Sequence, residues 1–341
     1  MSAGRIEPVD HGGDLDAARR RYPEAPEPWI DLSTGINPHA YRFVAPGAQA
    51  WERLPQTSEE LALLQAATRR YGAESTDQIA AAPGSQALIQ VLPRLMEPSD
   101  VAVLAPTYTE HAAAWARCGH RVAEVETLAD AGQARVVVVV NPNNPTGRLI
   151  ARAELCDLAV RLQQQGGLLV VDEAFVDFTP QASLVQRIPA AAVVLRSFGK
   201  TYGLAGVRLG FALASAGVAQ RLRNELGPWS VSGPALGIGT AALLDDLWLS
   251  DMGERLARER GRLDSLLAAS GFAVLGGTHL FRLAEHARAG DVADVLGRDG
   301  IYVRRFASRP TWLRFGLPGT EPAWERLGLA LHEATALAAK R

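Results

Sequence analysis

The sequence predicts an α/β fold in which a doubly wound, mainly parallel sheet is followed by a smaller α+β domain. Short apolar runs alternate with helical stretches between residues 78 and 212, which is the pattern of parallel strands joined by crossover helices. Several of these runs, such as Val136 to Val140, are apolar without interruption, so helices should cover both faces of the sheet. A length of 341 residues allows two domains.

The composition is that of an ordinary soluble enzyme, with 48% hydrophobic residues, 21% charged residues and a net charge of -2. No arginine-rich run marks a nucleic-acid-binding face, and no apolar run is long enough to span a bilayer. Cys118 and Cys156 lie in unrelated contexts, and the seven histidines show no metal-binding spacing. We therefore expect a cytoplasmic protein that has no metal site and no nucleic-acid or membrane partner.

The elements follow in a regular order along the chain. Residues 1–35 should form an arm rather than a domain, because three prolines between residues 23 and 28 interrupt any helix. Ser58 is the expected N-cap of a helix that ends at Tyr71. Two further helices are expected from Ser85 to Met96 and from Arg152 to Gln164. The seven expected strands are Gln78 to Ala82, Val101 to Ala105, Arg121 to Val125, Val136 to Val140, Leu168 to Val171, Ala192 to Leu195 and Leu209 to Ala212.

Two glycine–proline pairs, Gly227-Pro228 and Gly233-Pro234, interrupt the pattern after the last strand. They suggest a large domain over residues 36–233 and a small C-terminal domain over residues 234–341. The small domain should begin with a long helix through Asp251 to Ser270 and continue as short strands and helices.

A glycine-rich stretch between residues 196 and 210 contains one lysine, Lys200, with Ser197 and Arg208 on either side. A lysine in a tight, mostly uncharged pocket has a lowered pKa and a nucleophilic amine. A serine and an arginine beside it form a small anion site. Together they suggest a phosphate-bearing aldehyde cofactor, pyridoxal phosphate (PLP). By itself such a stretch is more often an ordinary loop.

Further polar signals follow the expected strands at the edge where open α/β sheets bind ligands. Gly84, Ser85 and Gln86 open a helix, where free N–H groups hold an anion or where the residues form a simple N-cap. Tyr108 follows another strand and could stack on a flat cofactor or pack in the core.

Two more signals complete the set. Asn144 lies in a turn with three amides and two prolines directly after five valines, and such a rigid turn aims donors at a ligand. Asp172 ends a buried strand and needs a cationic partner, which could be a pyridinium nitrogen or an arginine. These sites and the Lys200 stretch together supply what bound PLP requires.

With these motifs the chain resembles the fold-type I, aspartate-aminotransferase-like PLP enzymes over nearly its full length. The resemblance implies that Lys200 forms the imine with PLP and moves protons, and that Asp172 pairs with the pyridinium nitrogen. It further implies that Asn144 donates to the ring oxygen and that Tyr108 stacks on the ring. The implied cofactor-binding residues are Gly84, Ser85, Gln86, Tyr108, Asn144, Asp172, Phe175, Ser197, Lys200 and Arg208.

Four segments are similar to the threonine-phosphate decarboxylases of cobalamin biosynthesis, which are relatives of the histidinol-phosphate aminotransferases: His11 to Gly13, Trp29 to Pro38, Asp172 to Phe178 and Tyr302 to Arg305. This similarity implies decarboxylation of a phosphorylated amino acid, L-threonine O-3-phosphate, by a homodimer. It also implies an N-terminal arm that closes the site and joins the small domain. The implied substrate-binding residues are His11, Ser33, Gly35, Asn37, Arg304 and Arg314.

Two residues depart from the aminotransferase pattern. Phe175 stands where those enzymes usually have a tyrosine that donates to the ring oxygen, and Leu54 stands where related enzymes often have a tyrosine that reaches the neighbouring subunit. A histidinol-phosphate-type aminotransferase and a non-catalytic binding protein with the PLP fold remain as alternatives. The residues alone do not decide which bond at Cα is broken.

Overall fold

The structure is a computed structural model that describes residues 12–339. The described chain forms two compact units. The large unit comprises residues 36–263 and 276–282, and the small unit comprises the remaining described residues. This division differs from the boundary expected at residue 234, because the helix that begins at Gly233 packs against the helix that ends at Tyr71.

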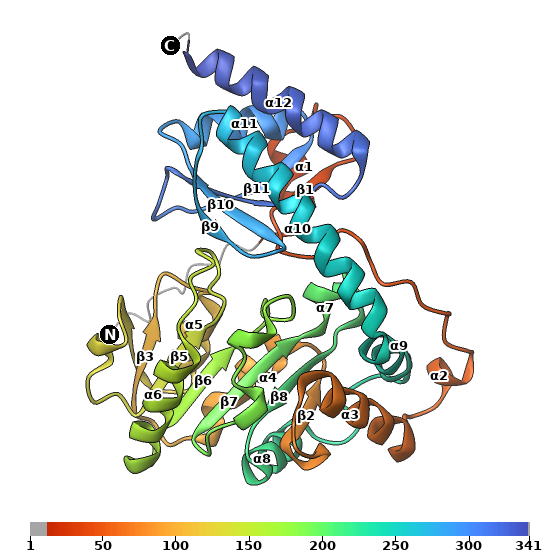
Figure 1. Ribbon diagram of the computed structural model, residues 1–341, viewed down its shortest axis with the longest axis vertical. Coiled ribbons are helices and arrows are strands. Elements are labelled where there is room, and N and C mark those ends of the chain that lie inside the picture. Colours follow the sequence, from red (N-terminus) through yellow and green to blue (C-terminus); the bar gives the residue numbers. More distant parts are fainter. Residues whose placement is uncertain (1–11, 340–341) are drawn as a thin grey trace. The chain divides into compact units, whose positions relative to one another are not determined.

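A seven-stranded sheet forms the centre of the large unit as the structure describes it (Figure 1). The strands run in the order β2-β8-β7-β6-β5-β3-β4, and β8 alone is antiparallel to its neighbours. All seven expected strands are confirmed, with ends shifted by at most two residues. Their bounds are β2 Ile79–Ala82, β3 Asp100–Leu104, β4 Arg121–Val125, β5 Val136–Val140, β6 Leu168–Asp172, β7 Ala192–Ser197 and β8 Gly210–Leu213.

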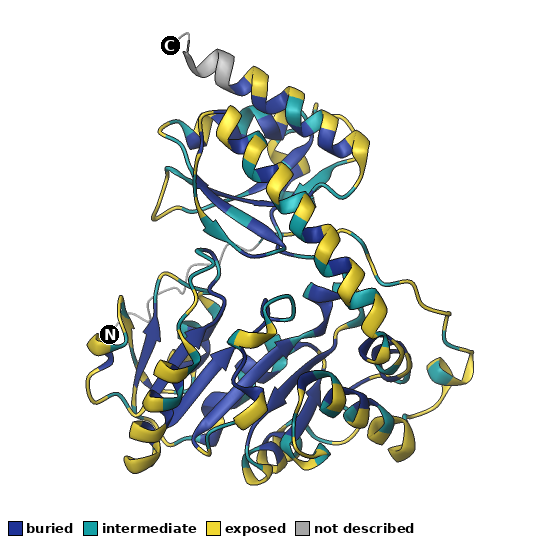
Figure 2. Ribbon diagram, viewed as in Figure 1, coloured by how far each residue is buried: buried dark blue, intermediate teal, exposed yellow. Residues whose placement is uncertain are grey.

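The alternation along each strand divides the core between the two faces of this sheet. Val137 and Val139 of β5 pack into one apolar cluster, whereas Val136 and Val138 pack into another. Figure 2 shows the strands buried and the helices buried on one side only. Helices therefore cover both faces, as the uninterrupted apolar runs predicted.

The helices of the large unit begin and end at residues that the local sequence explains. Helix α3 begins at Thr57, and its cap is Gln56 rather than the expected Ser58, because Gln56 and Glu59 form a reciprocal capping box. The helix expected to reach Met96 ends earlier, and a 3-10 turn with Pro93 near its start follows. The bounds are α2 Gln49–Glu52, α3 Thr57–Tyr71, α4 Ser85–Val91, α5 Glu110–Arg117, α6 Arg152–Gln164, α7 Phe198–Thr201, α8 Ala216–Leu226 and α9 Gly233–Leu244. A further helix, α10 Asp246–Ala269, begins in the large unit, and its residues from Asp264 on belong to the small unit.

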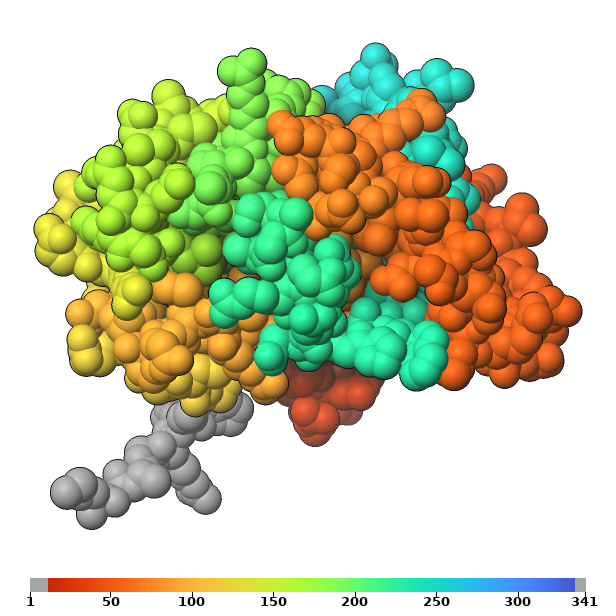
Figure 3. Space-filling model, turned by 90° about the horizontal axis from the view of Figure 1, so that it is seen from below, coloured from red at the N-terminus to blue at the C-terminus, as the bar shows by residue number. Residues whose placement is uncertain are grey.

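Short 3-10 turns connect many of these elements. The turn η1 contacts α8 and α3, and these elements lie side by side on the face of the large unit that Figure 3 shows. Their bounds are η1 Thr76–Gln78, η2 Leu92–Leu95, η3 Ala129–Ala131, η4 Pro180–Ala182, η5 Val185–Arg187 and η6 Ala205–Val207.

The small unit is built on a second sheet, with the strand order β1-β11-β12-β10-β9. The N-terminal segment contributes β1, which pairs in parallel with β11. The tip of the β9–β10 hairpin, residues 276–282, belongs to the large unit. The bounds are α1 Leu15–Arg21, β1 Ile30–Leu32, β9 Ala273–Gly277, β10 Phe281–Glu285, α11 Ala289–Arg298, β11 Ile301–Arg305, β12 Trp312–Gly316 and α12 Glu321–Ala339. Across residues 12–339, no helix combines the length and the apolar character that crossing a membrane requires.

Candidate active site

Three segments of the large unit meet at Gly210, the first residue of β8. Gly210 pairs with Ala82 of β2 on one side and with Ser197 of β7 on the other. A Cβ atom added to Gly210 would lie 2.3 Å from the backbone N of Ser85, so only glycine lets the turn after β2 come this close. The hydroxyl-bearing residues Ser85 and Ser197 are thereby held at one edge of the sheet.

Arg208 adds a positive charge at the same edge. It adopts the left-handed conformation (φ 55°, ψ 63°), and its Nη1 donates to the carbonyl of Ala205 at 3.0 Å. A Cβ atom added to Gly84 would lie 2.6 Å from Nη2 of Arg208, so the guanidinium lies against the start of α4. Two serine hydroxyls and a guanidinium beside bare backbone form a donor set that fits a phosphate group.

A hydrogen bond joins Tyr108, in the loop after β3, to Gln86, in the first turn of α4. The hydroxyl of Tyr108 donates to Oε1 of Gln86 at 3.1 Å, and Nε2 of Gln86 donates to Oε2 of Glu110 at 2.9 Å. Both ends of the Gln86 amide therefore have partners within the protein. The side chain of Gln86 holds Tyr108 beside α4. Because the side-chain amide is already hydrogen-bonded, we expect the backbone N–H of Gln86, and not its side chain, to contact a phosphate.

Asp172 lies at the end of β6, and its partner is a histidine. Nε2 of His111 is 2.9 Å from Oδ2 of Asp172, while the backbone N of Ala174 donates to Oδ1 at 3.0 Å. The side chains of His111 and Asp172 are only 2% and 6% exposed. His111 was not among the site residues expected from the sequence, although a polar residue on the apolar face of a helix is a signal that could have pointed to it.

Lys200 lies in α7, a single turn of helix that directly follows β7. Its carbonyl accepts a hydrogen bond from the backbone N of Asn37 at 3.0 Å, and Nδ2 of Asn37 donates to the carbonyl of Thr201 at 2.9 Å. Oδ1 of Asn37 accepts from the backbone N of His39. We expected Asn37 to bind substrate, but its amide is buried and supports the Lys200 turn.

The turn after β5 uses two of its three amides to hold itself together. Asn141 exchanges two hydrogen bonds with the backbone of Ile150, and Asn143 donates to the carbonyl of Pro106 and to Oγ1 of Thr146. Asn144 is half-buried at the same sheet edge, next to the end of β6, because Val140 and Asp172 are in register. The third amide of this turn, Asn144, is the residue that the resemblance assigns to the ring oxygen.

Phe175 is buried in the turn that follows Asp172. Its ring packs edge-to-face against Phe281, with the ring centroids 5.1 Å apart and an interplanar angle of 85°. Such a pair is a favourable aromatic geometry. The position is therefore filled by an apolar ring that has no hydroxyl to donate.

Two arginines face each other in the small unit. Arg304 of β11 and Arg314 of β12 are in register as cross-strand partners, so their side chains leave the same face of the sheet. Nη2 of Arg314 donates to the carbonyl of Ser33 at 2.6 Å. Burial and then the charge of Arg304 lower the pKa of Arg314 to about 10, which the carboxylate of Asp31 partly opposes. Arg314 therefore remains protonated at neutral pH.

The other expected substrate-binding residues have different surroundings. The hydroxyl of Ser33 is buried, donates to Oδ1 of Asp31 at 2.6 Å and accepts from the backbone N of Gly13 at 2.8 Å. Ser33 therefore fixes the N-terminal segment rather than presenting a free hydroxyl. Gly35 is buried at the end of the same segment. His11 lies outside the described residues. Within residues 12–339, no cluster of three metal-ligating side chains occurs.

Comparisons with known proteins agree with this arrangement. The profile of the family "Aminotransferase class I and II" matches residues 28–327. The chain is 46% identical to a threonine-phosphate decarboxylase of Pseudomonas aeruginosa, covering 95% of this chain and 97% of that protein. It is 42% identical to a threonine-phosphate decarboxylase of a Sinorhizobium species, covering 95% and 98%. The crystal structure of histidinol-phosphate aminotransferase from Sinorhizobium meliloti, in complex with pyridoxal-5'-phosphate, superposes with a TM-score of 0.81 at 23% identity and covers 99% of both chains. That structural likeness shows the fold.

Proposed function

Because this chain belongs to the aminotransferase class I and II family, we propose that it uses PLP to decarboxylate L-threonine O-3-phosphate. The products are (R)-1-amino-2-propanol O-2-phosphate and CO2. The similarity to threonine-phosphate decarboxylases along nearly the whole chain supports this activity. In the structure, the observation that carries the proposal is the register of Arg304 with Arg314. Two guanidinium groups on one sheet face suit a substrate that has both a carboxylate and a phosphate.

The described residues of the large unit fit PLP. The Cβ atom that Gly84 lacks would fall on the guanidinium of Arg208, so bare backbone and positive charge converge beside Ser85 and Ser197. We assign the cofactor phosphate to this group of residues. When bound, PLP supplies an electron sink that is conjugated to the Cα atom of the substrate.

The polar residues at the ends of the strands have separate roles toward the cofactor ring. If PLP is bound here, Nζ of Lys200 would hold it covalently and would carry protons at the reacting carbon. Asp172 would keep the ring nitrogen protonated, and the hydrogen bond from His111 orients the Asp172 carboxylate. Tyr108 would stack on the ring, and Asn144 would donate to the ring oxygen.

Phe175 limits the donors at the ring oxygen. An aminotransferase of this family usually has a tyrosine hydroxyl at this position, whereas here the ring is apolar and packs on Phe281. Asn144 is then the main donor to that oxygen. We expect this difference to alter the protonation of the bound cofactor.

Arg314 and Arg304 have distinct tasks toward the substrate. Arg314 is buried and is anchored by the carbonyl of Ser33, so it presents a fixed charge to the substrate carboxylate. Arg304 is half-buried and binds the phosphate. With both anionic ends held, the two arginines would restrict the substrate to one orientation, which would favour loss of the carboxylate over loss of the Cα proton.

The product is the aminopropanol unit of the nucleotide loop of cobalamin, so we place the enzyme in cobalamin biosynthesis. We also propose a cytoplasmic homodimer. Four large apolar side chains between residues 43 and 54 are exposed, namely Phe43, Val44, Trp51 and Leu54, with exposed fractions of 41%, 93%, 69% and 60%. Such a concentration in one short segment is typical of a surface that a partner covers.

The decisive experiment incubates the purified holoenzyme with L-threonine O-3-phosphate. We expect CO2 and aminopropanol phosphate in equal amounts, with no requirement for a 2-oxo acid. The matched control is Lys200→Ala, which should lose both products. Formation of a keto product only when a 2-oxo acid is present would overturn the proposal in favour of a histidinol-phosphate-type aminotransferase.

A further inference from the structure

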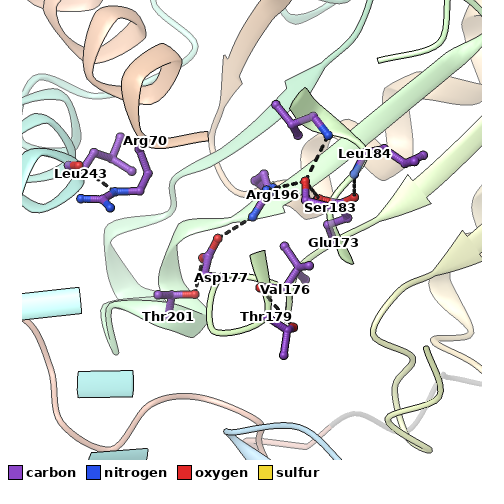
Figure 4. A network of polar contacts seen from close by, with 12 residues as sticks. Arg70, Glu173, Val176, Asp177, Thr179, Ser183, Leu184, Arg196, Thr201 and Leu243 are labelled. Carbon is purple, nitrogen blue, oxygen red and sulfur yellow. Dashed lines mark hydrogen bonds and ion pairs between the residues drawn. The ribbon is translucent and has the colours of Figure 1, made fainter. Parts of the chain in front are cut away.

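A buried ionic cluster lies next to the segments that carry Lys200 and Asp172. None of its residues has a role in the function proposed above. Its members are Arg196, Glu173 and Asp177, whose side chains are 4%, 0% and 8% exposed. Nη1 of Arg196 lies 2.6 Å from Oδ1 of Asp177, and Nε of Arg196 lies 3.2 Å from Oε2 of Glu173. Figure 4 shows Arg196 between Asp177 and Ser183. One arginine thus serves two carboxylates in the interior of the large unit.

Hydrogen bonds also hold the other polar atoms of the cluster, whereas Nε of Arg196 makes only the ion pair. Ser183 accepts from Nη2 of Arg196 at 2.9 Å and donates to Oε2 of Glu173 at 2.7 Å. The backbone N of Leu184 donates to Oε1 of Glu173 at 2.8 Å, and the guanidinium lies 4.7 Å from the ring centroid of Tyr71. Buried charges with this many partners hold a single geometry, because any displacement leaves a charge unpaired.

One end of the cluster holds the turn that contains Lys200. Asp177 bonds to Arg196 through Oδ1 and accepts a hydrogen bond from Oγ1 of Thr201 through Oδ2. Arg196 precedes Lys200 by four residues, and Thr201 follows it directly. A single helical turn such as α7 is not stable by its own hydrogen bonds. The carboxylate of Asp177 therefore bridges the two ends of the segment that carries the lysine.

The other end of the cluster holds the segment that contains Asp172. Glu173 follows Asp172 directly, and Asp172 is in register with Leu195, the residue before Arg196. The Arg196–Glu173 pair thus connects the chain just after Asp172 with the chain just before the lysine turn. The two strand ends that carry the main polar groups of the site are joined by one buried contact.

We propose that Arg196 and Asp177 are positioning residues that set Nζ of Lys200 relative to the carboxylate of Asp172. This inference rests on the proposed function insofar as it assigns Lys200 and Asp172 to the cofactor. It adds two residues that touch neither cofactor nor substrate. Their effect is transmitted through Thr201 on one side and Glu173 on the other.

Thr201 offers the least disruptive test. Thr201→Val keeps the shape of the side chain and removes the donor to Asp177, whereas Thr201→Ser keeps the hydroxyl. We expect Thr201→Val to slow the appearance of the absorbance band near ~420 nm when PLP is added to the apo-protein, and to lower kcat by about tenfold with little change in KM. Thr201→Ser should restore both. Thermal unfolding of the apo-protein reports the purely structural contribution.

Arg196→Lys tests the role of Arg196, and Arg223→Lys is its matched control. Arg223 donates to the carbonyls of Asp77 and Ile79, away from Lys200 in the fold, so Arg223→Lys should leave the rate of PLP capture and kcat unchanged. Arg196→Lys should lower both, because one ammonium cannot serve Asp177 and Glu173 with the geometry of the guanidinium. If Arg196→Lys does not fold, the Thr201 pair decides alone.

The proposal is overturned if Thr201→Val and Thr201→Ser behave alike, or if Thr201→Val lowers only the unfolding temperature. The proposal is also overturned if Arg223→Lys lowers the rate of PLP capture and kcat as much as Arg196→Lys does. Capture of PLP does not depend on the identity of the substrate. A wild-type protein that binds PLP but does not decarboxylate threonine phosphate would therefore contradict the proposed function and leave the positioning effect measurable.

Discussion

Nε2 of His111 lies 2.9 Å from Oδ2 of Asp172, and the two side chains are almost completely buried. A buried carboxylate needs such a partner, because its desolvation is otherwise uncompensated. The ring of His111 also meets the ring of Tyr108 at an interplanar angle of 85° and a centroid distance of 6.2 Å. His111 therefore connects the residue assigned to the ring nitrogen with the residue assigned to the ring face.

Replacing His111 by leucine should weaken the site without removing any group that contacts PLP. A hydrogen bond to a charged group contributes about 1.5–3 kcal/mol, so we expect kcat/KM to fall by roughly 10- to 100-fold in His111→Leu. The control is His120→Leu, since His120 is also buried but bonds to Ser99 and Pro93 instead. Steady-state decarboxylation assays of both variants distinguish the two. Equal losses of kcat/KM in the two variants would show that any buried imidazole has this effect, and that the contact with Asp172 is not its cause.

Substituting Phe175 by tyrosine tests the missing donor at the ring oxygen. A hydrogen bond to the ring oxygen favours the deprotonated form of the bound cofactor. The added hydroxyl should therefore lower the pH at which the absorbance band near ~420 nm has half of its full intensity. The measurement is a spectroscopic titration of Phe175→Tyr beside the wild type. An unchanged midpoint would mean that the Phe175 ring does not face the ring oxygen. Phe281→Tyr is the control for adding a hydroxyl to the same aromatic pair.

The two arginines that we propose to bind the substrate should respond differently to substitution. Arg304→Gln should raise KM for threonine phosphate by roughly 10- to 100-fold, as expected when a charged contact is lost. It should leave the inhibition constant of L-threonine nearly unchanged, because L-threonine has no phosphate. Arg314→Gln should weaken both ligands. Kinetics with threonine phosphate and inhibition by L-threonine give the comparison, and the opposite pattern would exchange the two assignments.

His279 should make stability depend on pH. Burial, aided by the charges of Arg260 and Arg282, lowers the pKa of His279 from 6.5 to about 4. Between these values the unfolded chain binds a proton that the folded chain does not, so the free energy of unfolding falls as the pH falls. The slope is at most about 1.4 kcal/mol per pH unit, and partial exposure reduces it. Denaturant unfolding at several pH values should give a flatter profile for His279→Asn. A parallel profile would contradict this assignment.

The proposed homodimer can be tested at the exposed apolar segment between residues 43 and 54. A carboxylate inside an apolar contact is costly, so Trp51→Glu should shift the protein toward monomers in analytical ultracentrifugation. Leu247 is 79% exposed but lies outside that segment, and Leu247→Glu should leave the association state unchanged. A monomeric wild type would rule out this surface as a dimer interface.

The large sheet could be predicted from the sequence because short local patterns identify its strands. Five consecutive valines form β5, and most of the other strands are short apolar runs. The ends of helices were harder to place. The capping box of α3 uses Gln56, which has a weaker preference for caps than Ser58. Whether α9 belongs with the large unit depends on its packing against α3, which no local pattern reveals.

Local sequence was enough to identify the reactive groups: a single lysine among glycines, a carboxylate at a strand end, and arginines near the C-terminus. Such features can be recognised locally, from the residue type and its distance in sequence from a strand end. The hydrogen-bond and ion-pair partners of these groups depend on the tertiary structure. His111 meets Asp172 across 61 residues and Arg196 meets Asp177 across 19, whereas the amides of Asn37 and Gln86 are used within the protein. Buried polar groups must find partners wherever the packing brings them, and that packing depends on the whole chain.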